Sequence, residues 1–377
     1  MAKVTLNELS KRYQSSSGAD VAAVTKVTLA IEDRELLVLF GRKGAGKSTV
    51  LRLISGLENA SAGDVSIGDR RVNDIVPHQR DIALVTSDDV LYPAMTVREN
   101  LAIGLQSQRF KDAEIKRRIG DAASVLAIEP LLDRQPAMLS LSERQKIAIA
   151  RALARQPKAI LLDEPFARLD TEARLQLRAE IAKLHQRRDT TIIYATSDSA
   201  DAMMLADRVA VLNEGAVQQV DTPEAIYDAP ANLAVASFFG TPPMNLIHGT
   251  LKQDREAIRF IEIGDGSIEL TLTGAAESVR ALAGQQVVLG VRAEDILLAR
   301  APKAQSGSGA TFPAVAELVE PTGAGTLIHV QTGAHAIVCR TGGAIPRADA
   351  GRRMRFELDQ TRLRFFDPAN GQRLASA

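Results

Sequence analysis

The chain has 377 residues, of which 45% are hydrophobic and 24% are charged, a composition typical of a globular protein of two or three domains. Its 46 basic and 46 acidic side chains balance, which gives no reason to expect a nucleic-acid partner, and its one cysteine, Cys339, excludes an internal disulfide framework. No apolar run reaches the about 18 residues of a membrane span, and the N-terminus lacks the apolar core of a signal peptide, so we expect a cytoplasmic chain.

The first segment, to about residue 40, alternates apolar and polar side chains, as at Val27, Leu29 and Ile31. Such alternation is typical of strands with one face in water, so we predict an antiparallel edge layer, with residues 14–20 as its polar turn. Tyr13 precedes this turn, and two interpretations stay open. Its ring stacks on a purine, or it is a half-buried strand side chain.

A glycine-rich segment follows the apolar run Leu36–Phe40 and precedes a helical apolar stripe that ends at Gly56. It fits the P-loop pattern G-x-x-x-x-G-K-[ST], in which backbone N–H groups and a helix N-terminus converge on phosphate oxygens. We predict that Lys47 reaches the outer phosphates and that the Ser48 hydroxyl ligates Mg²⁺. The predicted nucleotide-binding residues are Gly41, Arg42, Lys43, Gly44, Ala45, Gly46, Lys47, Ser48 and Thr49.

Strand and helix patterns alternate over the next 150 or so residues. Buried-strand runs occur at 82–86, 159–162 and 191–195, and the helical period between residues 97 and 155 predicts a helical insert at about 88–155. The alternation predicts an α/β domain with a parallel sheet covered on both faces, whose chemistry gathers at the carboxyl ends of the strands. The stretch 171–187 is predicted as an amphipathic helix, with an apolar face of Leu175, Leu177, Ile181 and Leu184.

Two carboxylates, Asp163 and Glu164, end one of these buried-strand runs. A charge at such a place is costly unless it meets a cation or takes part in chemistry. Because a P-loop lies upstream, we predict that Asp163 holds the Mg²⁺ shell and that Glu164 orients or deprotonates the attacking water. The simpler alternative is a solvated strand end.

The composition changes near residues 239–243, and short β-rich runs dominate beyond that point. We therefore predict an ATP-binding domain at 1–235 and a small β-barrel domain at 236–377. The serine- and glycine-rich stretch Ala301–Thr311 is predicted as a mobile loop. The predicted strands of the second domain are 257–263, 268–272, 287–291, 315–319, 327–330 and 352–358.

Taken together, these pieces resemble the ATP-binding subunits of ABC transporters, specifically the maltose-type carbohydrate-importer ATPases with a C-terminal OB-like regulatory (TOBE) domain. The resemblance runs through most of the chain. Its marks are Gly41–Thr49, Leu91–Pro93, Thr96–Asn100, Leu139–Ser140, Ala148–Leu153, Leu161–Pro165, Leu169–Asp170, Ala202–Met203, Ala206–Arg208, Met244–Asn245 and Gly290–Arg292 with Glu294.

The resemblance implies ATP and Mg²⁺ as cofactors, ATP hydrolysis, and a head-to-tail sandwich of two nucleotide domains around two ATP molecules. It implies integral membrane permease subunits as partners, docked around residues 91–100, and an extracytoplasmic solute-binding protein as an indirect one. The chain is then expected at the cytoplasmic face of the membrane as a peripheral subunit. Tyr13 is expected to stack on adenine, and Ser140 and Ser142 to contact the partner's ATP in trans.

Four departures from the family pattern accompany these agreements. The LSGGQ signature is Leu139-Ser140-Leu141-Ser142-Glu143, and a carboxylate about 5 Å from a phosphate opposes closure by roughly 3 kcal/mol at an effective dielectric near 20. Ser87 stands at the position of the family's glutamine, and Ser197 at that of its switch histidine. Arg42 and Lys43 replace Pro-Ser, and they either tighten polyphosphate binding or point to solvent.

We therefore expect the ATP-binding subunit of an importer for a sugar, polyol or related solute, paired as a heterodimer with a second, more complete ATPase to give unequal ATP sites. The alternative is a binding-only subunit of the same kind of complex, which takes up MgATP without hydrolysing it. A soluble ABC-type ATPase of DNA repair is disfavoured, because the sequence between Lys47 and Asp163 leaves no room for long coiled arms.

Overall fold

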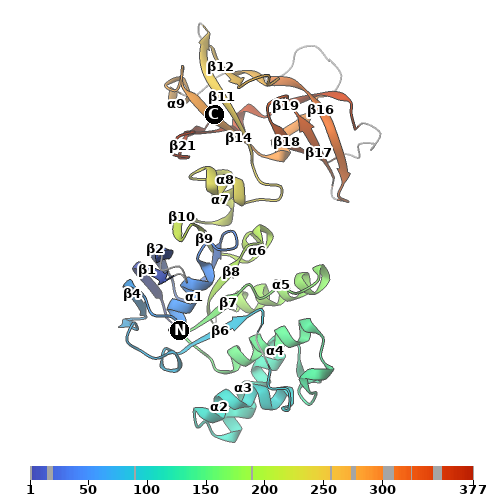
Figure 1. The fold of residues 1–377 in the computed structure, drawn as a ribbon. Helices are drawn as coiled ribbons and strands as arrows, with labels where there is room; N and C mark the ends of the chain where they lie inside the picture. Colours follow the sequence, from blue (N-terminus) through green and yellow to red (C-terminus); the bar gives the residue numbers. More distant parts are fainter. Residues whose placement is uncertain are drawn as a thin grey trace. The chain divides into compact units, whose positions relative to one another are not determined.

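The computed structural model describes residues 2–14, 20–88, 91–187, 190–254, 257–272, 277–299, 310–323, 325–342 and 350–376 (Figure 1). The chain divides into two compact units, Met1–Glu224 and Ala225–Ala377. The domain boundary after residue 235 stays a prediction. In the described ranges, no helix has the length and apolar character needed to cross a membrane.

The first unit begins with a four-stranded antiparallel sheet in the order β2-β1-β4-β5. Its longest pair, β1 and β2, runs antiparallel with Tyr13 opposite Val21, which confirms the predicted edge layer. Of the predicted turn at residues 14–20, Gln14 ends β1 and Asp20 begins β2, and residues 15–19 lie outside the described residues. The strands are β1 (Val4–Gln14), β2 (Asp20–Ile31), β4 (Ala62–Ile67) and β5 (Arg70–Arg71).

A six-stranded sheet in the order β10-β9-β3-β8-β7-β6 forms the centre of the first unit. Strands β3, β6, β7, β8 and β9 run parallel, so that their carboxyl ends share one edge of the sheet. The predicted buried strands are confirmed, and β9 with the antiparallel β10 extends the sheet beyond them. The bounds are β3 (Leu36–Phe40), β6 (Ile82–Thr86), β7 (Ala159–Asp163), β8 (Thr191–Thr196), β9 (Arg208–Asn213) and β10 (Ala216–Asp221).

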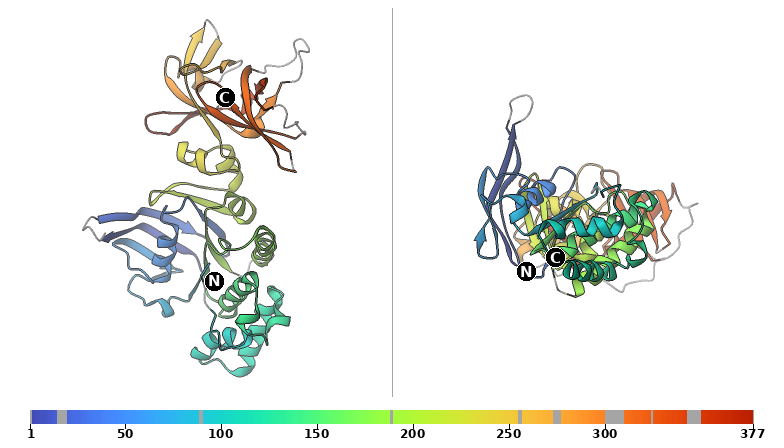
Figure 2. Two further views of the ribbon diagram at one scale, coloured as in Figure 1. Left: turned by 45° about the vertical axis from the view of Figure 1, so that its right-hand side comes forward. Right: turned by 90° about the horizontal axis from the view of Figure 1, so that it is seen from below.

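Helices α2, α3 and α4 form one cluster beside the β6 end of this sheet (Figures 1 and 2), which confirms the helical insert. Helix α2 begins with a capping box in which Thr96 and Glu99 satisfy each other's backbone N–H groups. The bounds are α2 (Val97–Ser107), α3 (Asp112–Val125) and α4 (Leu141–Ala154), with short 3₁₀ turns at Pro77–Gln79, Glu129–Leu131 and Pro136–Met138.

The remaining helices of the first unit are α1 (Lys47–Ser55), α5 (Thr171–Gln186) and α6 (Ser199–Leu205). The apolar stripe of α1 is buried in the core that the two sheets share. On α5 one prediction was wrong, because Leu175 is 52% exposed. At 3.6 residues per turn Leu175 lies about 200° around the helix from the buried Leu177, and Arg178 occupies the buried face instead.

The second unit contains a six-stranded sheet, β13-β12-β11-β14-β20-β21, and a five-stranded sheet, β15-β19-β16-β17-β18, around one apolar core. The predicted strands are all present. Of the predicted loop Ala301–Thr311, residues 301–309 lie outside the described part and Ala310 and Thr311 begin β16. The strands are β11 (Asn245–Asp254), β12 (Ala257–Glu262), β13 (Glu269–Leu272), β14 (Gln286–Val291), β15 (Ile296–Leu298), β16 (Ala310–Pro321), β17 (Thr326–Gln331), β18 (Ala336–Thr341), β19 (Arg353–Leu358), β20 (Arg364–Phe366) and β21 (Arg373–Ser376).

Arg292 follows β14 and belongs to Gly290–Glu294, one of the segments on which the family resemblance rests. It connects the helical start of the second unit to the sheet that contains β14. It donates to the carbonyl oxygens of Phe239 at 2.7 Å and Tyr227 at 2.6 Å and stacks on the Tyr227 ring. This mark of the resemblance therefore has a structural explanation. The short helices of this part are α7 (Pro223–Asp228), α8 (Leu233–Phe238) and α9 (Glu277–Arg280).

Candidate functional site

The P-loop joins the end of β3 to the start of α1, as the sequence predicts. Gly46 has a φ of 99°, in the left-handed region, and a Cβ there would lie 2.6 Å from the carbonyl oxygen of Ala23. A Cβ on Gly41 would lie 2.4 Å from the carbonyl oxygen of Leu212. The loop curls this tightly only because both positions lack a side chain.

Lys47 holds its ammonium group inside the curl of the loop, and its residue is only 5% exposed. Its Nζ donates to the carbonyl oxygens of Gly41 at 2.8 Å and Arg42 at 3.2 Å. The same Nζ lies 3.3 Å from Oε1 of Glu164. A positive charge is thus fixed where the loop's backbone N–H groups and the N-terminus of α1 converge, an arrangement that favours an anion.

Ser48 and Asp163 meet at the edge of the sheet. The Ser48 hydroxyl donates to Oδ1 of Asp163 at 2.8 Å, which links the first turn of α1 to the carboxyl end of β7. A hydroxyl and a carboxylate are hard oxygen ligands of the kind that Mg²⁺ uses together with phosphate oxygens and water. Among the residues that the structure describes, no group of three or more His, Cys, Asp or Glu is placed to hold a metal ion.

Glu164 lies between Lys47 and the segment after β8. Its backbone has a φ of 47°, which is strained for a residue with a side chain, and its N–H donates to the carbonyl oxygen of Ala195 at 3.0 Å. Its Oε2 accepts a hydrogen bond of 3.4 Å from the Ser197 hydroxyl. Strain of this kind is typical of functional positions, and the Glu164 side chain keeps 30% of its surface exposed.

A cavity of about 590 Å³ brings most of the predicted site residues together. Of the predicted loop residues that do not line it, Arg42 is exposed and Gly41 and Ala45 are buried. Tyr13, Asp163, Ser140 and Ser142 do not line it either. Asp163 contacts the lining residue Ser48 through a hydrogen bond, and the Tyr13 ring lies under the Lys11 ammonium at 4.9 Å. Its lining consists of Ala23, Lys43, Gly44, Gly46, Lys47, Ser48, Thr49, Ser87, Asp88, Glu164, Ala167 and Ser197.

The signature segment starts α4 with a capping box. Glu143 N–H donates to the Ser140 hydroxyl at 3.2 Å, and Oε2 of Glu143 accepts from Ser140 N–H at 2.7 Å. This bond to the Ser140 backbone lowers the pKa of Glu143, so the carboxylate is ionised at neutral pH. The pattern S-x-x-E signals a capping box, and it gives Glu143 a role in its own helix that the sequence interpretation missed.

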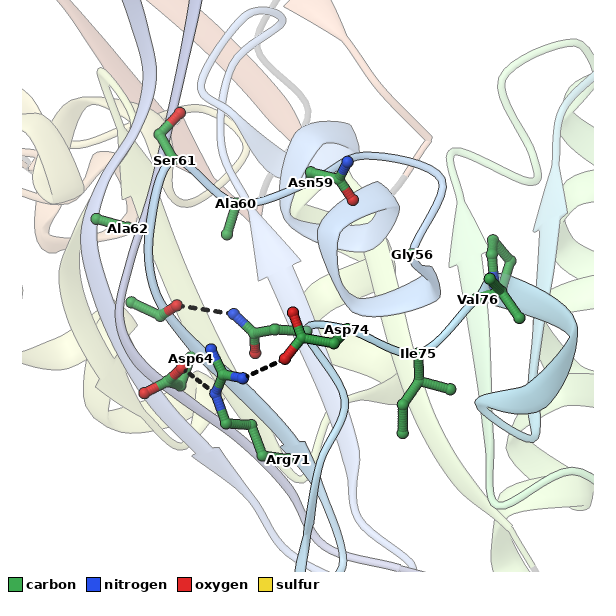
Figure 3. A pocket seen from close by; sticks show the side chains of 13 residues that line it. Gly56, Asn59, Ala60, Ser61, Ala62, Asp64, Arg71, Asp74, Ile75 and Val76 are labelled. Carbon is green, nitrogen blue, oxygen red and sulfur yellow. Dashed lines mark hydrogen bonds and ion pairs between the residues drawn. The ribbon is translucent and has the colours of Figure 1, made fainter.

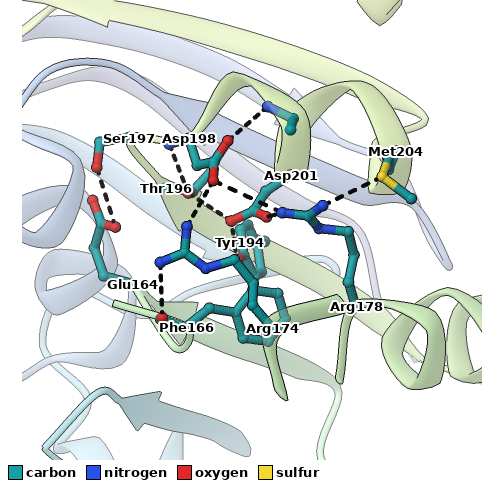
Figure 4. Close-up of polar contacts among 11 residues, drawn as sticks. Glu164, Phe166, Arg174, Arg178, Tyr194, Thr196, Ser197, Asp198, Asp201 and Met204 are labelled. Carbon is teal, nitrogen blue, oxygen red and sulfur yellow. Dashed lines mark hydrogen bonds and ion pairs between the residues drawn. The ribbon is translucent and has the colours of Figure 1, made fainter. Parts of the chain in front are cut away.

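Two arginines of α5 and two aspartates near α6 form a polar network that the sequence interpretation also missed (Figure 4). Arg174 Nη1 pairs with Oδ2 of Asp198 at 2.8 Å, and Arg178 pairs with the buried Asp201. Asp201 also accepts from the hydroxyl of Tyr194 at 2.8 Å, and burial raises the pKa of this tyrosine well above its usual range. The i, i+4 spacing of the arginines was visible in the sequence, but their partners come from another helix.

Ser87, at the position of the family's glutamine, follows the end of β6. The preceding carbonyl, of Thr86, accepts from Nε2 of the buried Gln145 on α4 at 3.3 Å. Beside it, a mostly apolar groove of about 450 Å³ runs between the sheet and the helical insert. Its apolar lining residues are Leu91, Pro93, Pro136, Ala137 and Leu141, and its polar ones are Ser87, Asp88, Arg144, Gln145 and Arg168.

A separate cavity of about 700 Å³ beside β4 and β5 is larger than the P-loop cavity (Figure 3). Arg71 in its lining pairs with Asp64 at 2.5 Å and Asp74 at 2.7 Å, so its charge is already neutralised. The P-loop and both carboxylates at the end of β7 lie elsewhere. We therefore take the smaller cavity as the candidate site.

Comparison with known proteins gives the family of the chain. The family model "ABC transporter" matches residues 24–167, the "MalK OB fold domain" residues 240–296, and the "TOBE domain" residues 289–366. The chain is 40% identical over 372 residues to the uncharacterized ABC transporter ATP-binding protein YurJ of Bacillus subtilis, covering 97% of this chain and 98% of that protein. It is 41% identical over 378 residues to the sn-glycerol-3-phosphate import ATP-binding protein UgpC of Ruegeria pomeroyi, covering both chains fully.

A solved structure is similar to the first part of the chain. The dimeric ATP-binding cassette MJ0796, in a post-hydrolysis state bound to ADP and Pi, superimposes with a TM-score of 0.52 at 26% identity. The match covers 58% of this chain and 98% of that one. The similarity therefore extends to a protein in which this fold holds the products of ATP hydrolysis.

Proposed function

Because this chain belongs to the ATP-binding proteins of ABC transporters, we propose that it is the ATPase subunit of an importer for a sugar, polyol or related solute. The P-loop ABC ATPase fold followed by an OB-type domain is the architecture of such import ATPases. The relative from Ruegeria pomeroyi is named for import of sn-glycerol-3-phosphate, a polyol phosphate, which supports this solute class.

One observation carries the proposal: Lys47, Ser48 and Glu164 line one cavity, and the Ser48 hydroxyl donates to Asp163 at the carboxyl end of β7. In this arrangement the loop N–H groups and Lys47 bind the phosphates of ATP. Tyr13 is proposed to stack on adenine, and its ring stands on the strand next to the edge of the antiparallel sheet. Lys43 lines the cavity, which favours phosphate binding over a purely solvent-facing role for this residue.

The residues present fit a magnesium ion. The hydroxyl of Ser48 and the carboxylate of Asp163, 2.8 Å apart, would hold it, and it would neutralise charge on the outer phosphate oxygens. Once phosphate attracts Lys47, the carboxylate of Glu164 is released to orient or deprotonate the attacking water. Ser197, which already donates to Glu164, keeps a hydrogen-bond donor beside this carboxylate but cannot carry the charge of the family's histidine.

For partners, we propose integral membrane permease subunits that dock at the apolar groove between the sheet and the helical insert. The groove includes Leu91 and Pro93, from the segment for which the resemblance implies docking. This places the chain peripherally at the cytoplasmic face of the membrane, with an extracytoplasmic solute-binding protein as an indirect partner. The part from residue 236 is proposed as the OB-like regulatory domain.

We further propose that the second ATPase of the complex is a different, more complete subunit. The capping box supports this, because Ser140 and its N–H already bond to Glu143 and the Ser142 hydroxyl lies 3.1 Å from that of Ser140. Because the Ser140 N–H already donates to the Glu143 carboxylate in this cap, the signature segment offers fewer hydrogen-bond donors to a phosphate of the partner's ATP. The ionised Glu143 carboxylate also repels that phosphate. In a heterodimer this weakness affects one ATP site, whereas a homodimer repeats it in both.

The second candidate is a binding-only subunit, favoured by Ser87 and Ser197 at the two altered positions. Purification of the native complex and comparison of wild-type and Glu164→Gln forms separates the two. The proposed function predicts a second ATP-binding subunit in the complex and a large loss of turnover in the variant. Unchanged turnover favours the binding-only subunit, and two copies of this chain with normal turnover contradict the heterodimer.

A further inference from the structure

One arginine of α5 joins the two irregular segments that carry Glu164 and Ser197. Arg174 Nη1 lies 2.8 Å from Oδ2 of Asp198, and Nη2 donates to the carbonyl oxygen of Phe166 at 3.2 Å. Phe166 is two residues after Glu164, and Asp198 is one residue after Ser197. A single planar guanidinium therefore bridges the backbone after β7 and the side chain after β8 (Figure 4).

Asp198 divides its two carboxylate oxygens between different tasks. Oδ1 accepts from the N–H of Ala200 at 2.8 Å and caps α6. Oδ2 lies 2.8 Å from Nη1 of Arg174 and, at the longer distance of 3.8 Å, also faces Nη2 of Arg178. The Asp198 N–H is held by the Thr196 hydroxyl at 3.0 Å. The turn that carries Ser197 is thus fixed on its α6 side by local bonds and on its Glu164 side through Arg174.

Arg178, one turn further along α5, differs from Arg174 in burial. The side chains of Arg178 and Asp201 are 6% and 2% exposed, so this pair belongs to the core and removing one partner would strongly destabilise the protein. The side chains of Arg174 and Asp198 are 30% and 31% exposed, and ion pairs this close to water contribute little to stability. The contribution of this ion pair to the free energy of unfolding is therefore small, and it does not explain why Arg174 contacts both segments.

We propose that Arg174 is a positioning residue for ATP hydrolysis, which sets how closely the Ser197 hydroxyl approaches the Glu164 carboxylate. That contact is 3.4 Å long, at the weak end of the hydrogen-bond range, so a small movement of either segment breaks it. The inference rests on the proposed function and adds to it a residue outside the cavity lining.

The test compares Arg174→Ala and Arg174→Lys with the wild-type full chain, together with any subunits that co-purify. Arg174→Ala is expected to lower kcat roughly 10- to 100-fold, because small misplacements cost that much, while KM for ATP and MgATP affinity stay within about twofold. Arg174→Lys is expected to recover part of the loss, because an ammonium group can keep Asp198 but lacks the fork that also reaches Phe166. A matched control is Arg117→Ala, which removes an exposed arginine paired with Glu114 and Asp121 on α3.

A double-mutant cycle tests whether Arg174 acts on the Ser197 segment through Asp198. Asp198→Asn retains an oxygen for the Ala200 N–H but loses the charge that faces Arg174. If Arg174 acts through Asp198, then combining Asp198→Asn with Arg174→Ala lowers kcat no further than Arg174→Ala alone. A kcat for Arg174→Ala within twofold of wild type, or losses that multiply in the double variant, overturns the inference.

Failure of the proposed function gives a different result. A wild-type complex that binds MgATP without turnover contradicts hydrolysis itself, and hydrogen exchange in residues 194–202 then decides the role of Arg174. Faster exchange of this segment in Arg174→Ala than in wild type and Arg117→Ala, with MgATP bound, supports the part of the inference in which Arg174 holds the Ser197 segment. Equal exchange in all three overturns it.

Discussion

The Lys47 ammonium group lies 3.3 Å from Oε1 of Glu164, so the two groups that the proposed chemistry needs most are paired with each other. The Lys47 side chain is 5% exposed, and water screens this pair only from the Glu164 side. A phosphate that enters the loop competes with Glu164 for the same ammonium group. Nucleotide binding and release of the carboxylate are therefore linked events.

This link predicts opposite effects of Glu164→Gln on binding and on turnover. Removing the carboxylate frees Lys47 for phosphate, so MgATP affinity is expected to stay equal or rise a few-fold. Turnover is expected to fall at least about 100-fold, because a positioned general base contributes 10²–10⁴-fold. Equilibrium binding and phosphate release measured on the same preparation check both, and a fall in affinity that parallels turnover would contradict the link.

Asp163→Asn tests the metal ligands. The amide keeps an oxygen for the Ser48 hydroxyl but removes the negative charge that favours Mg²⁺. We expect the Mg²⁺ concentration needed for half-maximal ATP hydrolysis to rise about tenfold or more, with affinity for metal-free ATP unchanged or higher. Asp64→Asn, in the larger cavity beside β4 and β5, serves as the control. An unchanged Mg²⁺ dependence in Asp163→Asn would remove this residue from the metal site.

Arg80 holds the far end of the P-loop helix and is only 4% exposed. Its guanidinium donates to the carbonyl oxygens of Leu53 at 2.8 Å, Ile54 at 3.0 Å and Ile75 at 2.8 Å. Arg80→Met leaves these buried acceptors without donors, which we expect to cost about 2–4 kcal/mol of unfolding free energy. Urea unfolding measures this cost, and the exposed Arg71→Met should stay within about 0.5 kcal/mol. A loss no larger than that of Arg71→Met would contradict the account of Arg80.

Asp295 gives the second unit a pH dependence. Burial raises the pKa of its carboxyl group from 3.8 to about 6. A folded-state pKa above the unfolded value means that the folded state binds the proton more tightly, so stability falls as the pH rises from about 4 to about 6. Carboxyl groups whose pKa is lowered, such as Glu143, act in the opposite direction, so the prediction concerns the difference between two proteins: the Tm of wild type falls relative to that of Asp295→Asn over this window. Parallel Tm curves for the two proteins would show that Asp295 does not titrate in this range.

Much of the first unit and of its site was predictable because the signals are local. The P-loop, the buried strand ending at Asp163 and the apolar stripe of α1 each lie within a short stretch of sequence. The bridge between Arg174 and Asp198 was not predictable, because it depends on how α5 packs against α6. Leu175 was a different kind of error, because at 3.6 residues per turn it lies about 200° around α5 from Leu177, and the sequence alone places it off the buried face.

The capping role of Glu143 was missed although its signal is local. Its charge was interpreted only against a phosphate from a partner, whereas the capping box that occupies it is encoded within four residues of sequence. The S-x-x-E pattern was visible in the sequence, but Glu143 was interpreted only as a replacement of the family's glutamine. In the described part of the second unit five strands went unpredicted: β11, β15, β18, β20 and β21. For β15 and β20 the reason is length, because three residues do not establish an alternation.

The central claim is that one MgATP binds where Lys47, Ser48 and Asp163 meet. Calorimetric titration of the purified complex with MgATP tests it most directly, with Lys47→Met as the variant and Lys43→Met as the control on the same loop. We predict saturable binding to wild type, a loss of at least about 100-fold in affinity at this chain's site for Lys47→Met, and a loss of a few-fold for Lys43→Met. No heat with wild type, or equal binding to wild type and Lys47→Met, would contradict the claim.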